Sequence, residues 1–553
     1  MSRKQKQFGP ETPGRHRPDL TEAILLFSPF LTGLFYLWGA ALTVIGLTAA
    51  LLLKQRKEAL RFFLSPLLLA FGSLVLFQLG GCLWGTDRGM ALAGALQFLP
   101  LPLFVLALQQ REPEERMQML RFLPHTAAAM VLLTILLSLL PPCADRFLVN
   151  GRLAGFFQYP NVFAIYLLSA LIVLLQGGSS SRKEKWSLFP VLLVGLALTQ
   201  SKAAAVLLIA VLLLSAVRAE SGKEKGLLAL AAALFAGAGP FLALTGRVSF
   251  STFYGRLLYA QDAVPVILRH PLGLGYTGYY WLQGSFQTGV YSVRHVHNEL
   301  LQLLLDVGWI PAGLFLWALV QAFRAPDGNF CRRLLLAVLC VHALFDFDTQ
   351  FVAVAFLLLT AASVEPLGAA GHDGRETCMS TARKLSPHVF TAVSGLLCLF
   401  ALWLGTASVL LETDRPQEAA GLYSAYTEAL IRMLPESGDG DLADRILRLN
   451  DSAAPAWDIR AENAFQRGDF DTALSAKEEA VRLSRYNQQE YLEYRNMLEQ
   501  IRLRLSGRGD AAGAARCTAK LEALPGMMEA VLEQTSALGR MIQDRPNLML
   551  PPS

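Results

Sequence analysis

Charged residues are scarce in this chain. They account for 17% of its 553 residues, whereas hydrophobic residues account for 53%, and the mean hydropathy is +0.39. Apolar runs recur along the chain as far as residue 410. This composition predicts an all-α, polytopic helical membrane protein.

Cysteine is sparse and shows no metal-binding spacing. The seven cysteines are scattered, odd in number and free of C-x-x-C pairs. This pattern excludes both a zinc site and a disulfide framework. The sequence contains no other metal motif, so we expect neither a metal nor another cofactor.

The sequence also lacks a nucleic-acid-binding patch and a cleavable signal peptide. The net charge is +5, but the basic residues form short clusters between apolar runs, where they orient a chain in a bilayer and form no nucleic-acid-binding patch. No small-residue cleavage site follows the first apolar run, so residues 1–21 are predicted to be a cytoplasmic basic tail and not a removed signal peptide. We therefore expect a lipid bilayer, and no nucleic acid, as a partner.

The apolar runs predict twelve or thirteen membrane spans. Several runs fall short of the ~20 residues that a spanning helix needs, so the pairs within 22–53, 186–217 and 333–364 could each be miscounted. The predicted segments are 22–36, 37–53, 62–82, 89–109, 118–140, 160–177, 186–200, 201–217, 226–245, 298–322, 333–346, 350–364 and 387–409.

Charge alternation along the chain favours thirteen spans. Every second loop carries three or four basic residues, as the cytoplasmic side of a membrane protein does. These loops are 54–61, 110–121, 178–185, 218–225, 323–333 and 365–386. The alternation predicts a multi-pass cell-membrane protein with a cytoplasmic N-terminus, in which the large loop 246–297 and the C-terminal segment lie outside the cytoplasm.

The domain organisation follows from these boundaries. The predicted parts are a membrane domain at 22–365, a cytoplasmic linker at 366–386, a last transmembrane helix at 387–409 and an extracytoplasmic tetratricopeptide-like domain at 410–553. The best repeat lies at 453–486, where small residues and a Gly-Asp turn have the spacing of a tetratricopeptide unit, with weaker units at 416–448 and 488–524. Because the signature Trp and the closing Pro are missing or displaced, a generic helical hairpin bundle is the alternative.

Polar motifs gather on the predicted outer side. In chain order they are Arg152 with Gly155 and Pro160-Asn161, Ser201 at the start of a span, Pro271-Leu272-Gly273-Leu274-Gly275, His297-Asn298 with Leu301-Gln302 and Gly308, and His342 with Asp346. Their order resembles that of the O-antigen ligase and O-antigen polymerase family of integral-membrane glycosyltransferases, and the resemblance covers about residues 20–365.

The resemblance implies inverting, metal-independent transfer of a glycan from an undecaprenyl-diphosphate carrier to an acceptor hydroxyl, during polymerisation or ligation of a cell-surface polysaccharide. The implied partners are the lipid-linked glycan donor, a glycan, lipid or protein acceptor, and a protein that binds the C-terminal domain. Polymerases and ligases share all of these motifs, so both remain open.

The chemistry of this transfer suggests roles for individual residues. A diphosphate leaving group needs positive charge in a low-dielectric cleft, and arginine binds phosphate oxygens bidentately. Arg152 and Arg256 match the family's arginine positions, and His297 is predicted to accept the proton of the acceptor hydroxyl. Substrate-binding roles are assigned to Asn298, Gln302, Lys202, His342, Asp346 and Arg294.

Each assignment has a structural alternative. His297 could cap the helix that begins at Asn298, and the arginines, Arg294 above all, could be interfacial anchors that reach lipid phosphates. His342 and Asp346 lie four residues apart on one face of a predicted span, where they either contact substrate or join two short spans. The family often has arginine at the position of Lys202, which keeps the charge but loses the bidentate geometry.

Two other classes of function stay open. A transporter of lipid-linked oligosaccharides also needs many spans and arginines, but its charged residues should line a path from both faces. A non-catalytic membrane scaffold that acts through the repeat domain would not need the polar cluster around Arg152 and His297.

Overall fold

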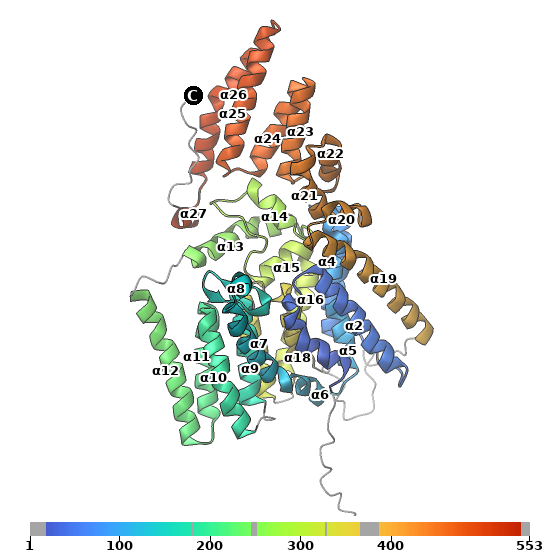
Figure 1. Cartoon of the computed structure of the whole chain (residues 1–553), viewed down its shortest axis with the longest axis vertical. Coiled ribbons are helices and arrows are strands. Elements are labelled where there is room, and N and C mark those ends of the chain that lie inside the picture. Colours follow the sequence, from blue (N-terminus) through green and yellow to red (C-terminus); the bar gives the residue numbers. More distant parts are fainter. Residues whose placement is uncertain (1–17, 178–180, 245–250, 327–328, 365–385, 544–553) are drawn as a thin grey trace, which may run out of the picture.

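The computed structural model describes residues 18–177, 181–244, 251–326, 329–364 and 386–543, and these are helical almost throughout (Figure 1). The predicted all-α class is confirmed. A short antiparallel pair, β1 (Leu148–Val149) and β2 (Arg152–Leu153), is the only sheet among the described residues. The helices of the first half are α1 Leu20–Phe27, α2 Leu37–Gln55, α3 Pro66–Trp84, α4 Ala91–Phe98, α5 Pro100–Gln109, α6 Pro113–Gln118, α7 Leu123–Ser138, α8 Pro141–Phe147, α9 Pro160–Gln176, α10 Arg182–Thr199, α11 Lys202–Arg218 and α12 Gly222–Leu244.

The second half contains the last apolar helices and a C-terminal set of helical hairpins. In Figure 1 these hairpins lie at the top, α13–α15 lie beneath them, and the apolar helices form the lower part. The helices are α13 Ser251–Arg269, α14 Gly278–Leu282, α15 Glu299–Val307, α16 Trp309–Arg324, α17 Phe330–Ala343, α18 Val352–Ala362, α19 Pro387–Glu412, α20 Pro416–Leu422, α21 Thr427–Ser437, α22 Gly440–Leu449, α23 Ala454–Arg467, α24 Phe470–Leu483, α25 Gln488–Gly507, α26 Ala511–Glu533 and α27 Ala537–Ile542.

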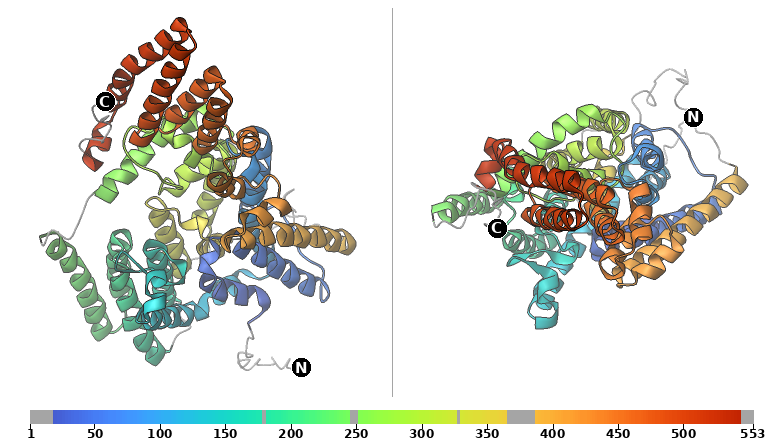
Figure 2. Two further views of the ribbon diagram at one scale, coloured as in Figure 1. Left: turned by 45° about the horizontal axis from the view of Figure 1, so that its top comes forward. Right: turned by 90° about the horizontal axis from the view of Figure 1, so that it is seen from above.

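Five helical segments are long and apolar enough to cross a membrane. They are Leu37–Gln55, Pro66–Trp84, Arg88–Gln109, Glu115–Ser138 and Pro387–Glu412. Their outward faces expose large apolar side chains, among them Leu76 (67% exposed), Leu136 (59%) and Leu399 (64%). Water-soluble proteins rarely expose apolar patches of this extent, so these faces are suited to lipid. Seen from above, α19 and α12 lie at opposite edges of the molecule (Figure 2).

Two shorter apolar helices, α9 and α18, form the centre of the lower part. Every residue of α18 and all but three of α9 are buried. α9 packs against α7, α10, α11 and α17, while α18 packs against α5, α16 and α17. A helix that is apolar on every side needs neighbours on every side. These helices can therefore be short because protein, and not lipid, surrounds them.

The predicted segment 298–322 is not one helix. It divides into α15 and α16 at Gly308, whose φ is +74°. A Cβ at Gly308 would lie 2.2 Å from the carbonyl oxygen of Pro271, because the 271–275 turn packs against this junction. In that turn the Leu274 N–H donates to the Leu305 carbonyl (2.6 Å) and the Gly275 N–H to the Asp306 carbonyl (3.0 Å). The turn thus occupies the place where an unbroken helix would run.

The C-terminal hairpins dock onto the segment between α3 and α4 through a buried carboxylate. Thr427 Oγ1 donates to Asp87 Oδ1 (2.8 Å) and Asn450 Nδ2 donates to Asp87 Oδ2 (3.2 Å). The Tyr423 hydroxyl donates to the Gly89 carbonyl (2.7 Å). Burial raises the pKa of Asp87 to about 7.

Basic loops meet at the end of the apolar helices that lies farthest from these hairpins. Lys185 pairs with Glu224 (2.8 Å), which joins two of the predicted cytoplasmic loops, and Arg61 pairs with Glu112 (2.7 Å), which joins two more. Figure 1 shows α6 and the α11–α12 turn at the bottom, opposite α20–α27. These four basic loops therefore lie at the same end of the apolar helices.

Candidate functional site

The side chain of Asp346 is the centre of a buried polar cluster. Its carboxylate is 1% exposed and lies in the turn after α17, which ends at Ala343. The Tyr159 hydroxyl donates to both carboxylate oxygens (3.1 and 3.2 Å), and Asn161 Nδ2 donates to Oδ2 (2.7 Å). Arg256 Nη2 donates to the same oxygen (3.1 Å), while His297 Nδ1 lies 3.1 Å from Oδ1. Segments far apart in the sequence thus meet at one carboxylate.

His297 is held in one orientation by this carboxylate. A carboxylate only accepts hydrogen bonds, so Nδ1 of His297 carries a proton, and Nε2 is the ring nitrogen that does not face Asp346. The side chain of His297 is 21% exposed, and its backbone has a φ of +52° just before the N-cap of α15. A bulky residue in the left-handed region implies a local constraint. Here the constraint points the imidazole at Asp346, a geometry suited to a general base.

A second histidine nearby lacks this access. His295 is buried and stacks on Phe347, with ring centroids 4.8 Å apart. Burial and the neighbouring Arg294 lower its pKa to about 3. His295 therefore stays neutral inside the protein, and His297 is the histidine that can exchange a proton with a substrate.

Arg152 is positioned by the β1–β2 turn. Its Nη2 donates to Asn161 Oδ1 (2.6 Å) and its Nε donates to the Thr199 carbonyl (2.9 Å). Asn161 thus links Arg152 to Asp346, because its Nδ2 donates to the Asp346 carboxylate. Burial lowers the pKa of Arg152, but a guanidinium stays charged at neutral pH.

An open cavity of about 620 Å³ adjoins the cluster. Its polar lining contains three cations, Arg152, Lys202 and Arg256, together with the polar residues Asn161, Gln200, Ser201, Thr252 and Tyr254. The apolar lining residues are Ala203, Val206, Leu207, Phe253, Val341 and Phe345. Three cationic side chains and a hydrocarbon surface therefore face one space, which suits an anionic head group joined to an apolar chain.

Two buried polar atoms of the lining have no hydrogen-bond partner among the described residues. They are Arg256 Nε and Ser201 Oγ. A buried polar group without a partner costs about 1–3 kcal/mol, and such costs are concentrated where a ligand supplies the missing bond. Ser201 is also the residue just before the first turn of α11, where backbone N–H groups favour an anion.

Asn298 and Gln302 hold the segment that carries His297 through hydrogen bonds. The Asn298 side chain accepts from the Leu301 N–H (3.0 Å) and donates to the Leu344 carbonyl (2.9 Å). Gln302 accepts from the Val296 N–H (2.9 Å) and donates to Asp306 (2.8 Å). Both residues therefore hold the segment that carries His297, and like His297 itself they lie outside the lining of the 620 Å³ cavity.

His342 and Asp346 do not share a helical face. Because α17 ends at Ala343, Asp346 lies outside the helix and turns toward His297. His342 is fully buried and pairs with Asp348, Nδ1 to Oδ2, at 2.6 Å. The expected pair is therefore divided between two separate His–Asp pairs, and His342 does not line the cavity.

Arg294 faces the C-terminal hairpins instead of the cluster. Its Nη1 lies 3.4 Å from Glu428 Oε1 of α21. The predicted residues Arg152, Lys202, Arg256, His297 and Asp346 are thus at the cluster or its cavity, whereas Arg294 is at a domain contact.

Tyr159 is the cluster residue that the sequence did not single out. It lies between Gly155 and Pro160 in the motif around Arg152. Burial and the neighbouring Asp346 raise the pKa of Tyr159 above its usual value, so its hydroxyl keeps its proton and donates to the carboxylate. Nothing in the spacing of that motif indicated that this side chain would contact Asp346.

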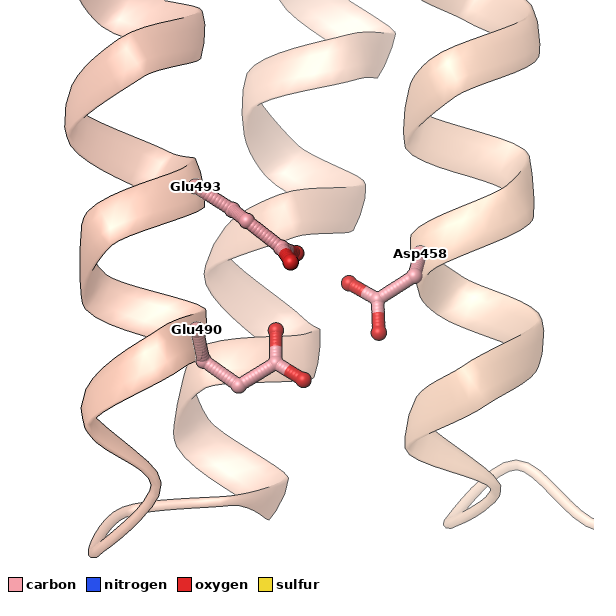
Figure 3. Close-up of side chains that lie close together, drawn as sticks. All are labelled: Asp458, Glu490 and Glu493. Carbon is pink, nitrogen blue, oxygen red and sulfur yellow. The ribbon is translucent and has the colours of Figure 1, made fainter.

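Three carboxylates of the C-terminal hairpins converge as metal ligands do. Figure 3 shows Asp458, Glu490 and Glu493 pointing toward one another from two helices, α23 and α25. Lys477 of α24 donates from Nζ to each of them at 2.7 Å. Its ammonium supplies the positive charge at this point, so the arrangement is that of an internal salt-bridge network.

Comparison with known proteins adds no relative: no protein-family model, curated protein or solved structure matches the chain. The site is therefore interpreted from its own geometry.

Proposed function

We propose that the protein transfers a glycan from a polyprenyl-diphosphate carrier to an acceptor hydroxyl at the outer face of the cell membrane. The cavity beside Asp346 is the observation that carries the proposal. Its cationic wall suits a diphosphate, and its apolar lining suits a prenyl chain.

The charges of the cavity favour an anionic leaving group. Arg152, Lys202 and Arg256 line the cavity, and Arg256 also pairs with Asp346. Arg256 binds Asp346 through Nη2, and its buried Nε has no protein partner among the described residues. A phosphate oxygen would satisfy that donor and that of Ser201 after a small shift of these buried atoms toward the cavity. As negative charge develops on the departing diphosphate, the cationic side chains of the lining stabilise it.

His297 serves the acceptor in this mechanism. The acceptor oxygen attacks the anomeric carbon of the donor sugar while the bond from that carbon to the diphosphate oxygen breaks. The hydroxyl proton passes to Nε2 of His297, and the electron pair of the broken bond leaves with the diphosphate. Asp346 stabilises the imidazolium that forms. Attack opposite the leaving group inverts the anomeric centre.

The proposed topology places this cluster outside the cytoplasm. Thirteen spans put the basic loops inside the cell, and the α20–α27 hairpins at the other end then lie outside. The resemblance to O-antigen ligases and polymerases rests on the motifs that supply Arg152 and His297. A hydroxyl acceptor delivered from the outer side could be a glycan, a lipid or a protein.

Transfer by purified protein in nanodiscs tests the proposal directly. With undecaprenyl-diphosphate glycan extracted from the producing cells, we expect Arg256→Ala to lower the rate by at least about 100-fold and His297→Ala by roughly 100- to 10,000-fold. Arg269→Ala, an exposed arginine on the same helix α13, is the matched control and should be fully active. Chelators should leave the rate unchanged. Wild-type rates in both Arg256→Ala and His297→Ala would refute the assignment.

A deletion strain distinguishes the reactions that share this chemistry. Loss of long glycans with short units still attached indicates a polymerase. Full-length glycan left on the carrier outside the cell indicates a ligase, whereas carrier-linked glycan retained inside indicates a transporter and contradicts the proposed transfer.

A further inference from the structure

A second cavity, of about 450 Å³, lies between the loop after α14 and the C-terminal hairpins. One wall comes from residues 280–292 and the other from residues 452–487. Its lining residues are Tyr280, Trp281, Gln283, Gly284, Gln287, Val290, Tyr291, Ser292, Ser452, Ala454, Pro455, Leu483, Ser484, Tyr486 and Asn487. The residues of the proposed transfer reaction do not take part in it.

Backbone contacts hold the two walls together. The Arg485 N–H donates to the Gly284 carbonyl (3.3 Å), and the Ser536 N–H donates to the Thr288 carbonyl (2.9 Å). A Cβ at Gly284 would lie 1.8 Å from the Leu483 carbonyl oxygen, so only glycine permits this approach. The cavity therefore has a defined shape, and does not depend on a loose contact between surfaces.

The lining is aromatic and polar without being charged. None of the described residues that line it is Asp, Glu, Lys, Arg or His. Trp281 and Tyr280 lie at 72° to each other with ring centroids 5.0 Å apart. Tyr291 donates its hydroxyl to Asp262 (2.9 Å) and Tyr486 shares a hydrogen bond with Thr535 (2.8 Å), so both hydroxyls are engaged within the protein. The faces of the aromatic rings are thus available for contact with a ligand, and amide and hydroxyl side chains line the cavity beside them.

This chemistry suits one class of ligand. Aromatic faces pack against the C–H faces of sugar rings, and amides and serines exchange hydrogen bonds with sugar hydroxyls. A phosphorylated or acidic ligand would lose its hydration in a cavity that offers no counter-charge. The lining thus favours an uncharged, polyhydroxylated ligand.

Aromatic rings connect this cavity to His297. The Tyr259 ring lies 4.8 Å from the ring of Tyr291 in the cavity wall and 6.0 Å from the ring of His297. A single aromatic ring, that of Tyr259, therefore separates the cavity wall from His297, so the sugars that follow one reacting beside His297 would lie close to the cavity.

The geometry points to the 450 Å³ cavity as a binding site for an uncharged stretch of oligosaccharide, the part of the glycan that extends away from the reacting sugar. The inference rests on the proposed function for its glycan. It assigns the C-terminal hairpins a share in substrate recognition, because they contribute Tyr486, Ser484 and Asn487 to the wall.

Binding of isolated oligosaccharides to full-length protein in nanodiscs tests the inference. The probe is the set of size-fractionated oligosaccharides released by mild acid from the surface glycan of the producing cells, labelled at the reducing end. We expect saturable binding that is insensitive to salt, because the cavity carries no charge. Trp281→Ala should weaken binding about tenfold, the loss expected for one aromatic stacking surface.

Matched variants separate this role from folding and from catalysis. Trp457→Ala removes a tryptophan of α23 that binds the Asp451 carbonyl and does not line the cavity, and it should bind like the wild type. Ala454→Trp fills the cavity from the hairpin side and should abolish binding in a folded protein. Arg256→Ala should bind normally although it does not transfer.

The outcomes are distinct for the two proposals. Binding that is weakened in Trp281→Ala and abolished in Ala454→Trp supports the cavity assignment. This holds even if no variant or wild-type protein shows transfer, a result that would refute only the proposed function. Absence of saturable binding, equal binding by wild type and Ala454→Trp, or strongly salt-dependent binding would overturn the inference.

Discussion

Replacing the buried carboxylate of Asp346 with an amide should stop glycan transfer while preserving the fold. Asp346→Asn keeps the shape of the side chain but exchanges one acceptor oxygen for an NH₂ donor. Oδ2 accepts from Asn161 and Arg256, and Oδ1 faces His297 and the Phe347 N–H. In either position the NH₂ group faces groups that donate hydrogen bonds to Asp346 in the native protein, so one donor is placed against another.

The two orientations of the amide have different consequences, and both reduce transfer. If NH₂ replaces Oδ2, it removes two hydrogen bonds and leaves Arg256 without its anion. If it replaces Oδ1, His297 must accept at Nδ1, so its proton moves to Nε2 and the base toward the acceptor is lost. A wrong histidine tautomer of this kind lowers kcat roughly 10⁴-fold in the serine-protease triad. We expect a loss of about 10³- to 10⁴-fold here, equivalent to about 4–5 kcal/mol of transition-state stabilisation.

Transfer rates of the variant in nanodiscs measure this loss, with Asp348→Asn as the matched control. Asp348 also holds a histidine, His342, in a fully buried pair two residues further along the chain. Its amide variant should lower the melting temperature and leave kcat near the wild-type value. Equal kcat for wild type and Asp346→Asn, or equal losses in both variants, would refute the argument that Asp346 acts through His297.

Three further predictions concern stability and topology. Lys477→Met should lower the free energy of unfolding by about 3 kcal/mol, because three converging carboxylates lose their shared cation; an unchanged melting temperature would contradict this, and Lys477→Arg should be milder. Burial raises the pKa of Asp87 in the folded protein to about 7 from its usual 3.8, so on raising the pH the unfolded chain loses this proton before the folded protein does. The free energy of unfolding should therefore fall as pH rises from about 4 to 7, by up to roughly 4 kcal/mol. Asp87→Asn should flatten the pH profile of thermal unfolding, and an identical profile would contradict the raised pKa. In intact cells a membrane-impermeant maleimide should label Ser506→Cys, at the exposed end of α25, but not the buried native Cys517. It should label Glu58→Cys, in a basic loop, only after the cells are permeabilised, and the reverse pattern of the two introduced cysteines would contradict the proposed topology.

Hydrophobic periodicity predicted the helices well because burial or lipid contact requires long apolar runs. Each of the thirteen apolar segments contains an α-helix among its described residues, although 22–36 is α-helical only as far as Phe27 and 298–322 is divided at Gly308. The turn expected at Gly468-Asp469 joins α23 to α24. The break at Gly308 could not be predicted in the same way. It depends on the 271–275 turn packing against the helix, a contact between segments more than thirty residues apart.

The candidate site was predictable as a set of residues but not as an arrangement. Arg152, Arg256 and His297 were singled out by their order, and each lies at the cluster or its cavity. What unites them is Asp346, which was grouped with His342 because the spacing of four suggested one helical face. The helix ends between the two residues, and only the folded chain shows which histidine each aspartate holds.

Asp346 also explains how three cationic side chains can remain close together before a substrate arrives. Its carboxylate pairs with Arg256, so in the proposed reaction the diphosphate of the donor would enter a site that already has one anion. The two anions would share Arg256, and the native carboxylate would then weaken donor binding slightly while it orients His297. Asp346→Asn removes that competition. For this variant the KM for the donor should therefore stay level or fall, while kcat falls steeply. Replacement of a residue that only binds the donor in the ground state, such as Lys202, would not produce this combination. A rise in KM with unchanged kcat would mean that Asp346 contributes to donor binding and not to the chemistry of His297.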